Sequence, residues 1–185
     1  MNKLVLLVAI LAIVNNKISK DKWVSDLITI AKSPSEYKSK WPYNVLYWDG
    51  RRWYCDCVNI NKALFNGRNI NNPKKNSYQT TLGVTGDINT EGMINACTSV
   101  STDFKKLKAG EPRILHLNGH IGAYLGKEIQ VSKGTVNVVE CTAGWEHGAL
   151  FSYVDAHGTR RYTKGSTNTR GKWERHGLPS KWVQY

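Results

Sequence analysis

The sequence is short of cysteine and has no long apolar run, and each shortage excludes a class of protein. Four cysteines in 185 residues are too few for a small fold held together by disulfides, so a hydrophobic core must supply most of the stability. The longest apolar run, residues 4–14, falls short of the roughly 20 residues that span a bilayer. We therefore expect no membrane span. The chain also lacks internal repeats and low-complexity linkers, and its length fits one domain.

Acidic residues are few as well. Fourteen Asp and Glu stand against 26 Lys and Arg, which gives a formal net charge of +12. Such a field attracts polyanions, whether nucleic acid, anionic lipid or the phosphate-rich polymers of a bacterial wall, although a basic surface also serves solubility alone. No recognition-helix, RNA-binding or zinc-finger motif accompanies the basic residues, so sequence-specific binding of nucleic acid is not expected. The charge by itself names no partner.

The N-terminus indicates a secretion signal over residues 1–18. Lys3 precedes the apolar run, whose length fits the hydrophobic region of a signal peptide. No small-x-small cleavage site follows, because Asn15, Asn16 and Lys17 come next, and a buried N-terminal helix is the alternative. We predict cleavage between residues 14 and 19, a secreted, extracellular protein, and a single domain over residues 19–185.

Hydrophobic patterning predicts helices first and strands afterwards. Apolar residues at helical spacing indicate a helix that begins near Asp21 and ends before Pro34. A second, shorter helix is expected over residues 57–65, with Asp56 as its N-cap. The second half holds short runs rich in Val, Ile and Tyr between glycine-containing turns, at residues 113–126, 135–142, 149–155, 159–163 and 181–185. The prediction is an α+β fold in which N-terminal helices pack on a C-terminal antiparallel sheet.

The stretch WYCDCVNINKAL, residues 53–64, holds two of the four cysteines, and three interpretations compete for it. In the first, Cys55 and Cys57 bind zinc together with His116 and His120. Structural zinc sites place their thiols two to four residues apart, whereas a single residue separates these two. The Asn-Gly pair between the histidines also interrupts any helix that would align them. We therefore expect no metal and no cofactor.

In the second interpretation the cysteines form disulfides. Cys55 and Cys57 cannot easily bond each other, but secretion would permit a bridge from one of them to Cys97 or Cys141. The alternative for Cys97 and Cys141 is a pair of buried, unpaired thiols that act as small hydrophobic residues. Either arrangement is compatible with catalysis by a remaining cysteine.

In the third interpretation Cys57 is a nucleophile. A thiol attacks as the thiolate, so its pKa must fall below the free value of about 8.5. The dipole and the free N–H groups of a helix start favour the thiolate and can hold an oxyanion. Cys57 directly follows the predicted cap Asp56, whereas Cys55 lies before the helix and gains less. The spacing therefore favours Cys57.

A catalytic thiol needs a base, and His120 is the best placed of the five histidines. It opens a predicted strand, and the glycines at 119 and 122 allow a neighbouring backbone and a substrate to come close. His157 and His176 are predicted to be surface or packing residues.

The base needs a third group to hold its other nitrogen, and Glu140 is the candidate because it ends an apolar run where an unpartnered carboxylate would be costly. In a hairpin of residues 120–125 and 135–141 turning at residue 130, His120 faces Glu140. The strongest turn signal, residues 132–134, lies later, and a bulge at Gly126 would reconcile the two.

Three motifs in order, WYCDCVNINKAL, NGHIGAYLG and VVECT, resemble those of the NlpC-type peptidoglycan endopeptidases, papain-like thiol hydrolases of bacterial cell-wall peptides. The resemblance covers residues 20–185. It implies a papain-like fold, Cys57 as the nucleophile after Asp56, and His120 as the base. Glu140 stands where the family usually has histidine, asparagine or glutamine, and its acidic identity resembles the related CHAP amidases.

The stretch YWDG, residues 47–50, is similar to the family's tyrosine and Trp-Gly-Gly segment, which implies a place for Tyr47 near the oxyanion, beside Asp56 at the site. Val58 and Asn59 replace the serine or glycine that usually follows the cysteine. The activity implied is cleavage of a stem-peptide amide, typically the bond from D-glutamate to the diamino acid, with bacterial peptidoglycan as substrate and anionic wall polymers as partners. A muramoyl–alanine amidase and a non-catalytic basic wall-binding module are the alternatives.

Overall fold

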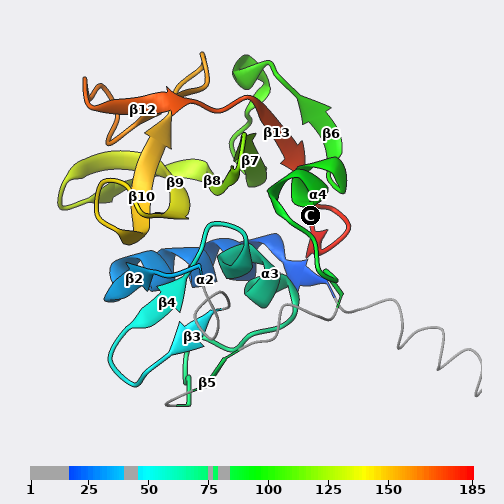
Figure 1. The fold of residues 1–185 in the computed structure, drawn as a ribbon. Coiled ribbons are helices and arrows are strands. Elements are labelled where there is room, and N and C mark those ends of the chain that lie inside the picture. The colour runs from blue at the N-terminus through cyan, green and yellow to red at the C-terminus, as the bar shows by residue number, and fades with distance from the viewer. Residues whose placement is uncertain (1–16, 40–45, 75–76, 79–83) are drawn as a thin grey trace, which may run out of the picture.

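The computed structural model describes residues 17–39, 46–74, 77–78 and 84–185. Most of the described second half forms one eight-stranded sheet in the order β12-β11-β10-β9-β8-β7-β13-β6, and every neighbouring pair is antiparallel (Figure 1). Its strands are β6 (Thr98–Ser101), β7 (Arg113–Leu117), β8 (His120–Val131), β9 (Gly134–Thr142), β10 (Gly148–Val154), β11 (Thr159–Arg161), β12 (Thr169–Lys172) and β13 (Arg175–Leu178).

The first half contributes a second, smaller sheet. It has four strands in the order β2-β4-β3-β5, namely β2 (Ser35–Tyr37), β3 (Tyr47–Trp48), β4 (Trp53–Cys55) and β5 (Ser77–Tyr78), with β2 and β4 parallel. A two-stranded parallel pair, β1 (Ile18–Ser19) and β14 (Val183–Gln184), joins the beginning of the described chain to its end. The sheet pairings therefore tie sequence-distant segments together.

The helices are few and short: α2 (Lys20–Lys32), α3 (Asn59–Phe65), α4 (Thr90–Asn95) and a 3₁₀ turn at Phe104–Lys106. Helix α2 begins one residue after Ser19, whose hydroxyl accepts the N–H of Lys22 at 3.2 Å, so Ser19 and not Asp21 is the cap. It ends at Ser33 because Pro34 cannot continue it. Its apolar face packs on β9 and β10, and in Figure 1 the helix runs between the large sheet and strands β3, β4 and β5.

The predicted fold class is wrong. The structure is mostly β, with an eight-stranded antiparallel sheet and three short α-helices among the described residues, and no helical layer packs on the sheet in the papain-like manner. The small sheet explains the error: its strands have only two or three residues, too few to show the period-2 alternation that marks a strand in the sequence. The predicted strands of the second half are present, but they form most of the fold rather than one layer of two.

One apolar core joins α2, α3 and both sheets. At its centre Phe65 lies between two tryptophans, with ring centroids 5.3 Å from Trp23 and 5.2 Å from Trp182. The indole N–H of Trp23 donates to Asn61 Oδ1 at 3.2 Å, which satisfies a polar atom inside this core. These contacts fix α3, and with it the chain that precedes it, against the rest of the molecule.

The predicted secretion segment lies almost entirely outside the described residues. Ile18, the last residue of the predicted segment, pairs with Val183 in the β1–β14 ladder. The described fold therefore includes Ile18, and cleavage of the segment stays a prediction. None of the helices in the described residues is long and apolar enough to span a membrane.

Candidate active site

Asp56 shapes the turn that carries Cys57. Its Oδ1 accepts the backbone N–H groups of Val58 and Asn59, at 3.0 and 2.8 Å, and its Oδ2 accepts the side-chain amide of Asn59 at 2.7 Å. The carboxylate thus holds the turn that leads into α3, but Asp56 is not the predicted N-cap, because the helix begins at Asn59, two residues later than expected, and Val58 is its cap residue. Because the N–H groups of Val58 and Asn59 are taken by this carboxylate, they are not free for an oxyanion. The N–H of Cys57 is the one that this carboxylate does not engage.

Cys57 lies against the start of β8. Its Sγ is 4.0 Å from the carbonyl oxygen of Gly119, and the backbone N–H of Ile121 also interacts with it. These two residues flank His120 in the chain, so the structure places the predicted nucleophile against the strand segment that holds the predicted base. The thiol is 8% exposed. Most of Cys57 is therefore buried, but a small part of it remains accessible to solvent.

The electrostatics of Cys57 differ from the sequence prediction. Burial raises the pKa of its thiol to about 11, and the carboxylate of Asp56 adds to the rise, while the N–H of Ile121 opposes it. The helix start was expected to lower this pKa. In the structure α3 is only seven residues long and the Asp56 carboxylate occupies N–H groups at its start, so desolvation outweighs the dipole. Cys57 is a neutral thiol at rest.

His120 and Glu140 are in direct contact. His120 Nε2 and Glu140 Oε2 are 2.6 Å apart, so Nδ1 is the ring nitrogen that this contact does not engage. The predicted register is off by two residues, because Gly122 and not His120 faces Glu140. The side chains meet diagonally across the strand pair, within reach of long side chains. The bulge predicted at Gly126 is present: the register shifts between Tyr124 and Ile129, and the turn falls after Val131.

Glu140 is fully buried and satisfied by three partners. Besides His120, Oε1 accepts the hydroxyl of Ser152 at 2.6 Å and the Nε–H of Arg160 at 3.0 Å, and Arg160 Nη2 lies 2.5 Å from Oε2. Burial alone would raise the pKa of Glu140, but the bonds from His120 and Arg160 outweigh it and lower that pKa to about 2. The group therefore stays an anion at neutral pH, and it stabilises the imidazolium that forms when His120 takes a proton.

Trp173 packs on the ring of His120. Its indole stacks on the His120 ring with centroids 5.5 Å apart and planes 16° apart. Gly122 makes room for it: a Cβ at this position would lie 2.7 Å from Trp173 Cη2 and 3.0 Å from Cζ2. The glycine is therefore required by the close approach of the indole and not by its backbone angles.

We predict that Gly122→Ala displaces Trp173 and loosens His120. The expected loss is about 1–3 kcal/mol in the free energy of unfolding, as for other overpacked cores, and roughly tenfold in kcat. Urea unfolding and steady-state kinetics measure the two. The double variant Gly122→Ala/Trp173→Phe lacks the clashing ring atoms and should regain most of the stability. A single variant as stable as wild type would show that the indole is not held where the structure places it.

Four residues of this site escaped the sequence analysis. Arg160 and Ser152 lie on predicted strand runs with nothing local to mark them as partners of Glu140, and Trp173 comes from the chain between β12 and β13. Tyr37 is the fourth: burial, and next the nearby Cys57 thiol, raise the pKa of its hydroxyl, so it stands close to the nucleophile. Tyr37 pairs with Cys55 in the β2–β4 ladder, a long-range contact that no local pattern reveals.

The other predicted residues have different places. Tyr47 lies in β3, where its ring is 5.8 Å from that of Tyr54, and its role near an oxyanion stays a prediction. Cys55, Cys97 and Cys141 are free and buried, and Cys141 Sγ lies 3.2 Å from the carbonyl oxygen of Cys55. His176 is fully buried between Arg113 and the carbonyl of Asp103, a packing role as predicted.

His116 does not join the cysteines. It is buried beside Glu91 and Arg175, with Nε2 3.2 Å from the Glu91 carboxylate. Among the described residues, no group of three His, Cys, Asp or Glu side chains could hold a metal ion.

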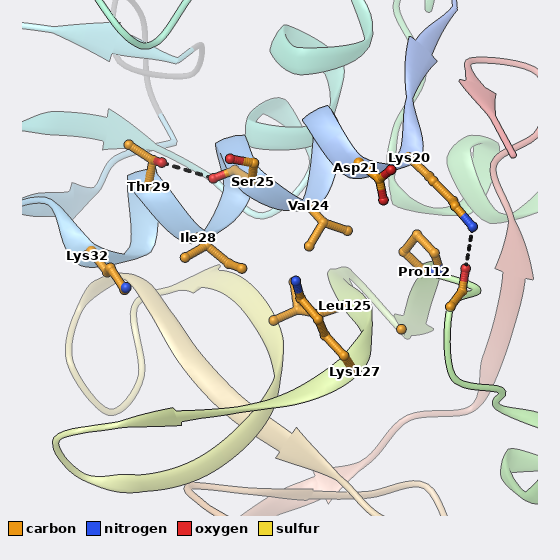
Figure 2. A pocket seen from close by; sticks show the side chains of 12 residues that line it. Lys20, Asp21, Val24, Ser25, Ile28, Thr29, Lys32, Pro112, Leu125 and Lys127 are labelled. Carbon is orange, nitrogen blue, oxygen red and sulfur yellow. Dashed lines mark hydrogen bonds between the residues drawn. The ribbon is translucent and has the colours of Figure 1, made fainter.

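A separate pocket of about 440 Å³ lies between α2, the turn before β7 and the middle of β8 (Figure 2). Its apolar floor is formed by Val24, Ile28 and Leu125, and Lys20, Lys32 and Lys127 stand at its rim with Asp21. Lys20 Nζ donates to the carbonyl of Gly110 at 3.0 Å. Cys57, His120 and Glu140 do not line it, so this pocket is basic surface and not part of the catalytic group.

No family model, curated protein or solved structure matches the chain.

Proposed function

We propose that this protein is a cysteine hydrolase that cleaves an amide in the peptide stem of peptidoglycan. The observations that carry the proposal are the place of Cys57 against the strand segment that holds His120, and the bond from His120 to Glu140. The sulfur touches the backbone on both sides of His120, and the outer nitrogen of His120 bonds a buried carboxylate at 2.6 Å. A nucleophile, a base and an orienting anion in this order are the parts of a thiol acyl-transfer site.

The proposed reaction proceeds through an acyl-enzyme. His120 Nδ1 takes the proton of Cys57 as the sulfur bonds to the carbonyl carbon, and the N–H of Cys57 holds the oxyanion. The C–N bond then breaks, and the proton passes from Nδ1 to the departing amine. Water adds to the thioester and gives a proton to Nδ1, and the C–S bond then breaks to release the acid as Nδ1 returns that proton to the sulfur of Cys57. Glu140 keeps Nε2–H in place throughout.

The raised pKa of Cys57 decides how the nucleophile is generated. A thiol with a pKa of about 11 is not a standing thiolate at neutral pH, so His120 must remove its proton during the attack, as a general base does for serine. The same burial favours the alternative, a non-catalytic wall-binding module that retains this group of residues as a buried network. The two alternatives differ in turnover, because the hydrolase releases cleaved product and the binding module does not.

The bond assignment rests on the motif resemblance and on the charge. The order of the three motifs points to the amide that joins D-glutamate to the diamino acid, and the muramoyl–alanine amide is the other candidate. A net charge of +12 suits an enzyme that meets anionic polymers outside the cell membrane, which agrees with a secreted protein.

Digestion of purified sacculi tests the function. Wild type should release soluble muropeptides whose masses identify the cleaved bond, and Cys57→Ala should release none. Release of lactyl-free stem peptides with intact glycan would identify the muramoyl–alanine amide instead. Tight binding to sacculi without any released product would establish the non-catalytic module.

Salt should separate attraction to the wall from catalysis. Screening shortens electrostatic reach to about 8 Å at physiological salt, so activity on whole cells should fall as salt rises to roughly 0.5 M. Activity on a small soluble muropeptide should change little. The variant Lys32→Gln/Lys127→Gln, which removes two cations from the pocket of Figure 2, should flatten the salt curve on cells. Parallel salt curves for the two substrates would refute the attraction.

A further inference from the structure

The loop between β9 and β10, residues 143–147, connects both sides of the candidate site. On one side, His147 accepts the N–H of Tyr37 at its carbonyl, at 3.1 Å, and its ring is 6.1 Å from the Tyr37 ring. On the other side, Trp145 lies 4.8 Å from the Arg160 guanidinium, which bonds Glu140. The loop therefore stands at the rim of the catalytic group.

This loop holds an unusual backbone. Trp145 and His147 have φ angles of 50° and 51°, in the left-handed region that costs a residue with a side chain about 1 kcal/mol or more. Polar bonds maintain it: the Trp145 indole N–H donates to Asn168 Oδ1 at 3.1 Å, and the N–H of His147 donates to the carbonyl of Gly144 at 3.2 Å. The conformation places a half-buried indole at the surface in a fixed orientation.

Flat groups alternate from His120 outward to the surface. Trp173 stacks on His120, the Arg160 guanidinium lies 5.6 Å from the Trp173 ring and 4.8 Å from the Trp145 ring, and the Arg170 guanidinium lies 5.6 Å from the Trp145 ring. Cation–aromatic contacts of this kind are attractive within about 6 Å. The stack starts at the proposed base and ends at an exposed arginine.

The two arginines of the stack differ in whether a carboxylate pairs with them. Arg160 is buried and paired with Glu140. Arg170, in edge strand β12, is exposed, and no carboxylate of the described part of the chain lies within ion-pair distance of it. Its guanidinium packs over Gly144, where a Cβ would lie 2.6 Å from Nη1. The loop therefore holds an uncompensated, bidentate donor in a defined place.

We propose that Trp145 and Arg170 form a substrate subsite that binds a carboxylate of an acidic peptide, several bonds from the scissile amide. A guanidinium recognises a carboxylate through two parallel bonds, and the indole face offers apolar contact to the adjoining chain. An extended peptide rises about 3.3–3.6 Å per residue, so a stem peptide of a few residues extends well beyond the scissile amide. The subsite rests on the proposed function and gives its substrate class.

The test uses two soluble muropeptides that differ only in whether a carboxylate is free or amidated. For wild type, we expect KM for the free acid to be about tenfold lower than for the amide, a size typical of a charge-assisted hydrogen bond at a partly exposed site. Arg170→Gln should raise KM for the free acid to that of the amide, with the loss in KM rather than kcat. Arg170→Lys, which lacks the fork, should recover only part of the preference. Lys172→Gln, an exposed cation two residues on in the same strand, should behave like wild type.

Two outcomes would overturn the subsite. One is an undiminished preference for the free acid in Arg170→Gln, and the other is an equal loss in Lys172→Gln, which would make the effect one of general charge. If wild type cleaves neither muropeptide, the proposed function fails and calorimetric binding of the same pair decides the subsite separately. Tighter binding of the free acid that Arg170→Gln abolishes would still support it, and equal binding of both peptides would refute it.

Discussion

Cys57→Ala is expected to abolish release of muropeptides from sacculi, by at least about 10³-fold, while the protein stays folded. Without the sulfur no acyl-enzyme can form, and removal of a catalytic nucleophile leaves only the modest contribution of binding and oxyanion contacts. Alanine is close in size to a buried thiol, and Cys57 is 8% exposed, so the stability should change by no more than about 1 kcal/mol. Muropeptide analysis and thermal unfolding measure the two effects.

Cys55→Ala is the matched control. Cys55 lies two residues away and is fully buried, and its neighbours in the fold are Tyr37 across the ladder and Cys141. It should retain most of the activity, with a small loss of stability from the cavity. Equal loss of activity in both variants would mean that the pair acts together, which would contradict a single nucleophile at Cys57.

Removing the charge of Glu140 should have the next largest effect. Glu140→Gln keeps the size of the side chain but removes the anion that stabilises the His120 imidazolium, so we expect kcat to fall on the order of 10- to 10³-fold. His120→Ala should lose more, because the base itself is gone. Glu140→Gln should also lower the free energy of unfolding by roughly 3 kcal/mol, because the Arg160 guanidinium loses its counter-ion while only 8% of its side chain is exposed.

A double variant separates the two losses. Glu140→Gln/Arg160→Gln removes the stranded cation together with the anion, so stability should recover while kcat stays low. Urea unfolding and kinetics on a soluble muropeptide distinguish these outcomes. Full activity of Glu140→Gln would show that another group orients His120 and that the contact at 2.6 Å has no catalytic importance.

The catalytic residues predicted for the candidate site lie in one region of the structure, whereas the predicted fold class is wrong. A local pattern of a few residues marks each of them. Cys57 follows the expected helix cap, His120 opens a strand, and Glu140 ends an apolar run. The predicted register of the hairpin was off by two residues, because the sequence does not show how many residues the bulge near Gly126 adds to β8. The diagonal contact nevertheless joins the same two side chains, His120 and Glu140, as the predicted directly opposed pair.

What the sequence could not provide depends on long-range packing. Arg160 reaches Glu140 from 20 residues away, and Trp173 reaches His120 from 53 residues away, through the order of strands in the sheet. The pKa of Cys57 was predicted in the wrong direction because a helix start is a local feature, whereas burial is set by everything that packs around the thiol. Strands of two or three residues in the small sheet gave no periodic signal, and the fold class was wrong for that reason.

Alkylation of Cys57 followed by a measurement of residual activity tests the central claim most directly. Iodoacetamide is applied at pH 8–9 in a Cys97→Ser background, because Cys97 is as exposed as Cys57, at 9% against 8%, whereas Cys55 and Cys141 are fully buried. The fraction of Cys57 that carries the label is read by peptide mass spectrometry and plotted against hydrolysis of a soluble muropeptide. We predict a straight line that reaches zero activity when Cys57 is completely labelled. Substantial hydrolysis by fully labelled protein would contradict Cys57 as the nucleophile.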